Sequence, residues 1–217
     1  MEIAEYFPIW DKLTVQQQEK VAEMATLRTV KKGTRVHDSD ADCLGLVIVT
    51  DGQLRTYILS EDGREVTLSR LFPYDVTLLS ASCVMPDLQF GVLIEAEKDS
   101  SFYTIPACLF KNLTDESLAA SKYAAGLIGS NLSELMWLME QIMWKSFDKR
   151  LAAFLLEESR NEGMKNLAIT HEKIANHLGT AREVVTRMLK YFQNEGMVKL
   201  TRGAIEITDQ KKLETLQ

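Results

Sequence analysis

The chain has 217 residues, of which 46% are hydrophobic and 26% are charged, an ordinary balance for a globular protein of one or two domains. No apolar run approaches the roughly 18 residues that a membrane span needs, and the amino-terminal stretch Met-Glu-Ile-Ala-Glu-Tyr is acidic. We therefore expect neither a membrane span nor a secretory signal, and we predict a cytoplasmic protein.

The net charge of −6 argues at first against a nucleic-acid partner, but the charges are unevenly placed. Residues 1–145 carry 13 Lys and Arg against 21 Asp and Glu, whereas residues 146–217 carry 12 against 10. Within residues 165–202 the balance is 7 against 3. Contact with phosphate requires only a local basic footprint, so the charge of the whole chain does not exclude DNA binding.

The first half of the chain is rich in predicted strands. Residues 8–27 resemble a short helical lead-in that Thr14 could cap. Strands are then predicted at residues 44–50, 53–59, 64–71, 90–97 and 101–105. Turn signals at Asp51-Gly52 and Glu61-Asp62-Gly63 separate the first three, and two hairpins so close together indicate an antiparallel roll or barrel.

The cysteines give no sign of a metal site or a disulfide framework. Cys43, Cys83 and Cys108 are odd in number and widely spaced, so buried structural thiols are the default reading. A redox or effector role for Cys83 is the alternative.

A long helix follows from residue 115. Its apolar and small residues recur at alternating steps of three and four, the heptad spacing of a coiled coil. This seam consists of Leu118, Ser121, Ala125, Ile128, Leu132, Leu135, Met139 and Ile142. We predict a homodimer interface formed by Ile128, Leu132, Leu135, Met139 and Ile142. Leu127, Met136, Trp137, Leu138 and Trp144 lie off the seam, so we expect the helix to pack on the roll as well.

Residues 170–192 have the layout of a helix-turn-helix, whose second helix enters the major groove of DNA. Thr170 is a good N-cap for the first helix, and Gly179 suits a left-handed residue at its end. Thr180, with Glu183 three residues later, is predicted to cap the second helix.

The second helix has one apolar and one polar side. The apolar side is predicted to carry Val184, Val185, Met188 and Phe192, and the polar side Arg182, Glu183, Thr186, Arg187 and Lys190. Such a polar side is often only a solvated helix face. Arginine, however, matches the O6/N7 edge of guanine, and glutamate can accept from cytosine N4. We predict that Arg182, Glu183, Thr186 and Arg187 read bases, and that Thr170, Thr180, Lys190 and Arg202 contact the DNA backbone.

The elements around this motif predict a winged helix. Residues 146–150 resemble a hinge and cap into a helix at 151–160. After the motif, residues 197–200 and 204–207 form a short hairpin across Arg202-Gly203. The fold class is therefore α+β, with an antiparallel β-roll, a long dimerisation helix and a carboxy-terminal winged helix-turn-helix.

The whole chain resembles the cyclic-AMP receptor / fumarate-nitrate regulator (Crp/Fnr) family of bacterial transcription factors. In the roll the similarity rests on Val49-Thr50-Asp51-Gly52-Gln53-Leu54-Arg55 and Asp62-Gly63-Arg64-Glu65. In the carboxy-terminal part it rests on residues 148–152, 170–175 and 182–187. The resemblance implies a sensor domain over residues 1–117 with a cyclic-nucleotide-binding-like roll, a dimerisation helix over 118–145 and a DNA-binding domain over 146–217. It also implies RNA polymerase as a partner.

The chain matches the cyclic-AMP branch of the family in its DNA-binding part but departs from it in the sensor part. In the cyclic-AMP branch an Arg-Glu-x-x-x-Arg series contacts bases, and Arg182, Glu183 and Arg187 match it. Nucleotide-binding members hold the cyclic phosphate with a Gly-Glu turn and a later arginine. Here the corresponding positions read Tyr74-Asp75-Val76-Thr77-Leu78-Leu79 and Phe90-Gly91. We therefore predict that cyclic nucleotides do not bind.

The effector stays open. The cysteine cluster that oxygen sensors use for an iron–sulfur centre is absent, because the three cysteines are too few and too dispersed. A redox- or haem-responsive regulator of the same fold is the alternative, although His37 is the only histidine outside the DNA-binding part. We predict an effector pocket at Leu71, Cys83 and Phe90, and we predict no cofactor. An enzyme built on the roll is disfavoured, because no histidine or glutamate cluster accompanies His37.

Overall fold

The computed structural model describes residues 2–37, 44–78 and 92–216, which form two compact units. The first unit comprises Met1–Leu59 and Leu68–Leu135, and the second comprises Ser60–Thr67 and Met136–Gln217. The long helix α3 (Leu118–Trp144) contributes its first part to one unit and its last part to the other.

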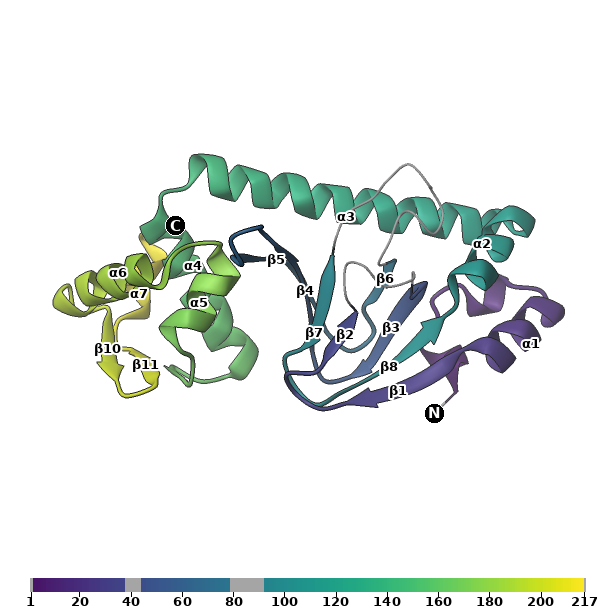
Figure 1. Cartoon of the computed structure of the whole chain (residues 1–217), viewed down its shortest axis with the longest axis horizontal. Helices are drawn as coiled ribbons and strands as arrows, with labels where there is room; N and C mark the ends of the chain where they lie inside the picture. Colours follow the sequence, from purple (N-terminus) through teal and green to yellow (C-terminus); the bar gives the residue numbers. More distant parts are fainter. Residues whose placement is uncertain (1, 38–43, 79–91, 217) are drawn as a thin grey trace. The chain divides into compact units, whose positions relative to one another are not determined.

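The first unit is built on two four-stranded sheets (Figure 1). One has the order β1 (Thr26–Val30), β8 (Ser100–Ile105), β3 (Leu46–Asp51), β6 (Val76–Leu78). The other has the order β2 (Arg35–His37), β7 (Leu93–Ala96), β4 (Leu54–Leu59), β5 (Glu65–Leu71). The two sheets share a buried apolar cluster of Val47, Val49, Leu54, Leu71, Ile94, Ala96 and Phe102. This arrangement confirms the predicted antiparallel roll.

The predicted strands at 44–50, 53–59, 64–71 and 101–105 correspond to β3, β4, β5 and β8. The strand predicted at 90–97 is shorter, because β7 covers Leu93–Ala96, while Phe90 and Gly91 lie outside the described residues. Strands β1, β2 and β6 were not predicted. Each is short, and the sequence of β1 lacks a regular apolar alternation.

Strand β4 is buried on both of its faces over most of its length. Period-two alternation is typical of a strand with one face in water. Here Leu54 is fully buried, and Arg55 and Tyr57 on the opposite side are only 4% and 1% exposed. The burial of charge in this sheet is offset by pairing, since Arg70 Nε lies 2.9 Å from Glu97 Oε2.

Helices cover the other face of the sheet that contains β3 and β8. Thr14 caps α1 (Val15–Met24) and accepts from the Gln17 amide, so the predicted cap is confirmed, although the helix is shorter than the predicted range 8–27. Two short 3₁₀ helices, Ile3–Glu5 and Trp10–Lys12, precede α1, and α2 (Ala107–Glu116) precedes α3. Ala120 and Ala124 of α3 are buried in this apolar layer with Leu46, Ile48, Ile105 and Phe110.

The off-seam residues of α3 divide into two groups. Leu127 packs against the apolar layer of the first unit, as the expected packing on the roll requires. Met136, Trp137 and Trp144 are 58%, 59% and 78% exposed in the part of the chain that the structure describes, and Leu138 is half-buried. Only the first half of the helix is therefore held by the roll.

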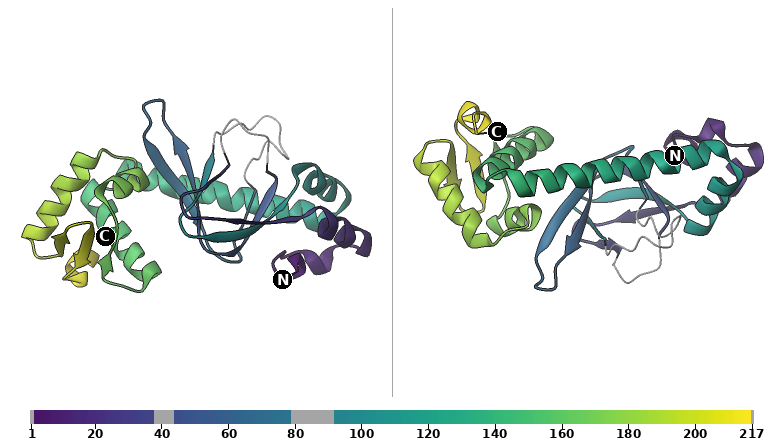
Figure 2. Two further views of the ribbon diagram at one scale, coloured as in Figure 1. Left: turned by 60° about the horizontal axis from the view of Figure 1, so that its bottom comes forward. Right: turned by 90° about the horizontal axis from the view of Figure 1, so that it is seen from above.

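The second unit is the winged helix. It contains α4 (Phe147–Glu162), β9 (Asn166–Leu167), α5 (His171–Leu178), α6 (Arg182–Asn194), β10 (Val198–Thr201), β11 (Ala204–Ile207) and α7 (Gln210–Glu214). Its strands form one small sheet in the order β10-β11-β9. The β10–β11 hairpin and the helices of this unit can be followed in Figures 1 and 2. The helix predicted at 151–160 is α4, and the predicted wing is the β10–β11 hairpin. β9 was not predicted because it is only two residues long.

No helix in the described part of the chain is both long enough and apolar enough to cross a membrane.

Candidate nucleic-acid interface

The turn between α5 and α6 is closed by backbone hydrogen bonds. Thr170 is the N-cap of α5, where its hydroxyl accepts from the Lys173 amide at 3.1 Å, as predicted. Gly179 has φ of 63°, and its amide and that of Thr180 both donate to the carbonyl of Ala175. This φ confirms the predicted left-handed glycine. Other residues are strained in this conformation, which is why glycine is favoured here.

Gly179 is also needed for space. Residues 60–67 belong to the same unit, and a Cβ on Gly179 would lie 2.7 Å from Val66 Cγ2. The same segment fixes His177, which is 6% exposed and has its Nδ1 2.8 Å from Thr67 Oγ1.

The predicted cap of the second helix is wrong. α6 begins at Arg182 with Ala181 at the N-cap, and no side chain caps it. Thr180 lies one residue before this N-cap position, and its amide donates to the Ala175 carbonyl at the end of α5. Glu183 therefore lies in the first turn of α6 as an exposed side chain rather than as half of a capping box.

The core side of α6 differs from the predicted one. Val185, Leu189 and Phe192 are fully buried, and they pack in a cluster that includes Leu151 and Leu155 of α4. Leu189 was missed in the sequence. Val184 and Met188, which were predicted on the same side, are only half-buried, and Met188 packs partly against this cluster.

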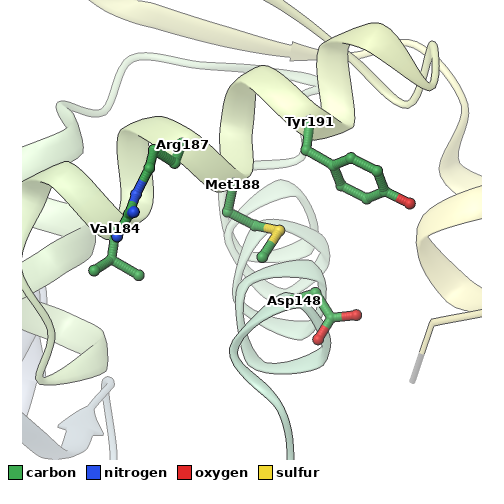
Figure 3. A pocket seen from close by; sticks show the side chains of 5 residues that line it. All are labelled: Asp148, Val184, Arg187, Met188 and Tyr191. Atoms are coloured by element: carbon green, nitrogen blue, oxygen red, sulfur yellow. The ribbon is translucent and has the colours of Figure 1, made fainter.

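Val184 and Met188 instead line a pocket of about 430 Å³ beside the start of α4 (Figure 3). Arg187 and Tyr191 of α6 and Asp148 of α4 complete its lining. Figure 3 shows the Met188 side chain pointing from α6 toward the end of α4 that carries Asp148. The pKa of Asp148 is lower than usual, mainly because its carboxylate forms a hydrogen bond with Ser146.

The polar side of α6 is open to solvent. The Arg182 side chain is 65% exposed, and its Nε lies 4.0 Å from the Glu172 carboxylate, which is itself 63% exposed. Glu183, Arg187 and Lys190 are also exposed. An exposed ion pair of this length contributes little to stability, so Arg182 is available for another partner.

Thr186 has a different environment from the other predicted base-reading residues. Its hydroxyl donates to the Arg182 carbonyl at 2.9 Å, and its oxygen lies 2.9 Å from His171 Nδ1 of α5. Because the only hydroxyl hydrogen is used within the motif, Thr186 can meet a base only through its oxygen or its methyl group. The contact with His171 was not predicted, since it joins residues on two different helices.

The predicted backbone-contacting residues are exposed or half-exposed. Thr170 lies at the start of α5, Lys190 on α6 and Arg202 in the turn of the wing, and all three are exposed. Thr180 is half-buried in the turn between the two helices.

The predicted dimer seam on α3 is largely open in the single chain. Leu132, Met139 and Ile142 are 58%, 53% and 46% exposed. Leu135 is half-buried, and Ile128 packs partly against the apolar layer of the first unit.

The predicted effector pocket lies only in part within the described residues. Leu71 is 7% exposed in the cluster between the sheets, while Cys83 and Phe90 lie outside the described residues. Cys43 also lies outside them, and Cys108 is exposed, so the expectation of a buried thiol is wrong for Cys108. Thr56 Oγ1 and Ser69 Oγ lie 2.8 Å apart on neighbouring strands, and they are polar residues of the roll that were not singled out in the sequence. In the described part of the chain no three His, Cys, Asp or Glu side chains are grouped to hold a metal ion.

Comparison with known proteins identifies the family. The Crp-like helix-turn-helix domain matches residues 149–216. A crystal structure from Eubacterium rectale, described as a transcriptional regulator of the Crp/Fnr family, is 55% identical to this chain. It covers 98% of this chain and 99% of its own, with a TM-score of 0.95. The chain belongs to the Crp/Fnr family.

Two curated relatives agree with this assignment. The transcriptional activator protein anr of Pseudomonas aeruginosa is 24% identical over 209 residues, which cover 93% of this chain and 84% of the relative. The transcriptional regulator SdrP of Thermus thermophilus is 28% identical over 174 residues, covering 77% and 81%. The chain is thus a Crp/Fnr-type transcription regulator with a helix-turn-helix DNA-binding domain, and its relatives are regulators rather than enzymes.

Proposed function

We propose that this Crp/Fnr-family chain is a homodimeric, effector-controlled regulator that reads DNA with α6. The observation that carries the proposal is the exposure of Arg182, Glu183 and Arg187 on one helix, opposite a face that is fully buried. A helix held in this way can enter the major groove without losing its own core.

The spacing of the two arginines suggests which bases they meet. Arg182 and Arg187 are five residues apart, or about 1.4 turns of helix. They can therefore address two guanines that are a short step apart rather than adjacent. Glu183 lies between them in angle and can accept from a cytosine amine on the opposite strand. Each half-site should contain a G-x-G core.

Backbone contacts would orient the helix in the groove. Lys190 supplies a cation on the exposed side of α6, and Arg202 supplies another at the tip of the wing. Thr170 and Thr180 flank the helices at their amino-terminal ends, where backbone amides favour phosphate. These contacts would give affinity to every sequence alike.

The dimer follows from α3. A seam that exposes Leu132, Met139 and Ile142 needs a covering surface, and a second copy offers the same residues across a two-fold axis. Two DNA-binding domains related in this way would recognise an inverted repeat with centres about one helical turn apart. In this proposal residues 1–117 form the sensor domain, 118–145 the dimerisation helix and 146–217 the DNA-binding domain.

The sensor would respond to something other than a cyclic nucleotide. In place of a Gly-Glu turn, Val76–Leu78 form β6, whose residues pair with β3 from Leu46 to Ile48. The backbone of Val76–Leu78 is therefore part of a sheet, while Leu79 lies outside the described residues. A redox or haem effector remains the alternative. We also propose a cytoplasmic location and contact with RNA polymerase, as for a transcription regulator.

Selection of binding sites from a random-sequence DNA library tests the proposal. We expect enrichment of an inverted repeat with paired guanines in each half. Enriched sequences that lack both features would overturn it, as would the failure to enrich any sequence.

A further inference from the structure

His171 lies beside two of the residues that are proposed to read DNA. It is the first residue of α5, directly after the N-cap Thr170, and it is half-buried. Its Nδ1 lies 2.9 Å from the hydroxyl of Thr186 on α6, and Arg182 acts on it electrostatically. It therefore occupies the junction between the two helices on the side that carries Arg182 and Thr186.

The hydrogen bonds determine which ring nitrogen of His171 carries the proton. The Thr186 hydroxyl donates its only hydrogen to the Arg182 carbonyl, which cannot donate in return. With that hydrogen directed to the carbonyl, the Thr186 oxygen accepts from His171, and we assign the hydrogen to Nδ1 and the lone pair to Nε2 in the neutral ring. Among the described residues, none forms a hydrogen bond with Nε2. A proton can thus be added at Nε2 without breaking the contact with Thr186.

The free protein keeps His171 neutral near pH 7. Burial lowers the pKa of His171 from its ordinary value of 6.5, and the positive charge of Arg182 lowers it further. The charged neighbours on α5 itself are Glu172 and Lys173. The charged residues nearby on other elements are Arg64, Glu65 and Glu183. They line a pocket with Glu172 and Arg182, and His171 is not part of its lining.

DNA binding would raise the pKa of His171 again. If Arg182 enters the major groove, the phosphate backbone lies beside the amino-terminal end of α5, because the first helix of the motif crosses the backbone. A phosphate neutralises the effect of Arg182 and favours the charged imidazolium. We infer that His171 is a DNA-backbone contact that takes up a proton at Nε2 when DNA binds, and donates from Nε2 to a phosphate oxygen.

The inference rests on the proposed DNA reading by α6, and it predicts the sign of the pH dependence. A group whose pKa rises on binding strengthens binding fully below its free pKa, and the gain is lost as the pH rises through the bound pKa. DNA affinity should thus fall with rising pH between these two values, by up to about tenfold per pH unit for each protomer.

The test uses the full-length protein and a duplex recovered by selection from random DNA. Titration calorimetry near pH 7 in buffers of different ionisation enthalpy should show uptake of up to about one proton per protomer. In the His171→Asn variant the amide can still donate to Thr186, but it cannot titrate, so the uptake should disappear. The His171→Arg variant should bind with an affinity that no longer depends on pH in this range.

His177 is the matched control. It lies on the same helix but is buried and bonded to Thr67, so His177→Gln should keep the proton uptake of the unmodified protein. Because the chain has only three histidines, NMR titration of their ring protons, free and DNA-bound, measures the pKa of His171 without any variant.

Two results would overturn the inference: a pKa of His171 that does not rise on DNA binding, or equal proton uptake by the parent and His171→Asn. Failure to select any duplex would instead contradict the proposed DNA reading. Replacing the phosphates of the duplex one at a time by uncharged methylphosphonates should abolish the uptake at one position in each half-site. Uptake that no single replacement changes would also contradict a phosphate contact.

Discussion

The apolar faces of α6 and α3 have similar spacing but opposite environments. On α6, Val185, Leu189 and Phe192 are fully buried by their own chain. On α3, Leu132 and Met139 are more than half exposed. Periodic apolar residues thus predict an apolar helix face, but only the structure shows whether the same chain covers that face.

This difference separates folding from assembly. The core of α6 belongs to the winged helix and should hold at any protein concentration. The seam of α3 is a row of large apolar side chains in water, which is typical of a surface that another molecule covers. Equivalent substitutions in the two helices should therefore act on two different equilibria.

The largest effect is expected for Leu189→Ala. Removal of a fully buried leucine side chain should lower the free energy of unfolding of the winged helix by about 2–5 kcal/mol. Denaturant unfolding followed by circular dichroism should show this loss at every protein concentration. Leu132→Ala is the matched control in α3, and its effect should shrink as the protein is diluted. Equal, concentration-independent losses for both would contradict the comparison.

The next effect is expected for Leu132→Asp. A carboxylate in an apolar contact between two helices would be left without a partner, so the dimer should dissociate at micromolar concentration while each protomer stays folded. Analytical ultracentrifugation measures the change. Ser133→Asp places the same charge on an exposed position off the seam and should leave a dimer. A monomeric parent protein would refute the proposed interface.

A smaller effect is expected for Lys190→Ala. Loss of one phosphate contact should weaken binding to all sequences alike and reduce the slope of log affinity against log salt by about 1 per protomer. Fluorescence anisotropy over a salt series measures both. Lys111→Ala removes an exposed lysine of α2 that pairs with Asp115, and it should change neither. A loss confined to one DNA sequence would show that Lys190 contacts a base.

Much of the winged helix could be predicted from the sequence because its signals are local. The Thr170 cap, the left-handed Gly179 and the wing each depend on a few neighbouring residues. The Thr180 cap predicted for α6 is wrong because α6 begins at Arg182, so that Ala181 rather than Thr180 takes the N-cap position. Leu189 was missed because periodicity alone does not determine which side of α6 faces α4. The direction in which α6 leaves the preceding turn also determines it.

The roll was harder to predict because its residues depend on distant partners. Arg55 resembles an outward-facing residue of an alternating strand, yet it is 4% exposed and its guanidinium lies 4.4 Å from the Tyr57 ring centroid. Arg70 and Glu97 are far apart in sequence and form a buried pair. Such contacts come from strands brought together by the fold, and no local pattern reports them.

The most direct test of the account compares one guanine with one arginine. On the selected duplex, exchange of the guanine assigned to Arg182 should cost the parent protein about 1–3 kcal/mol of binding free energy. Arg182→Ala should bind both duplexes equally, whereas Arg187→Ala should still prefer the guanine. If Arg182→Ala discriminated between the two duplexes as strongly as the parent, α6 would not read DNA in the way proposed.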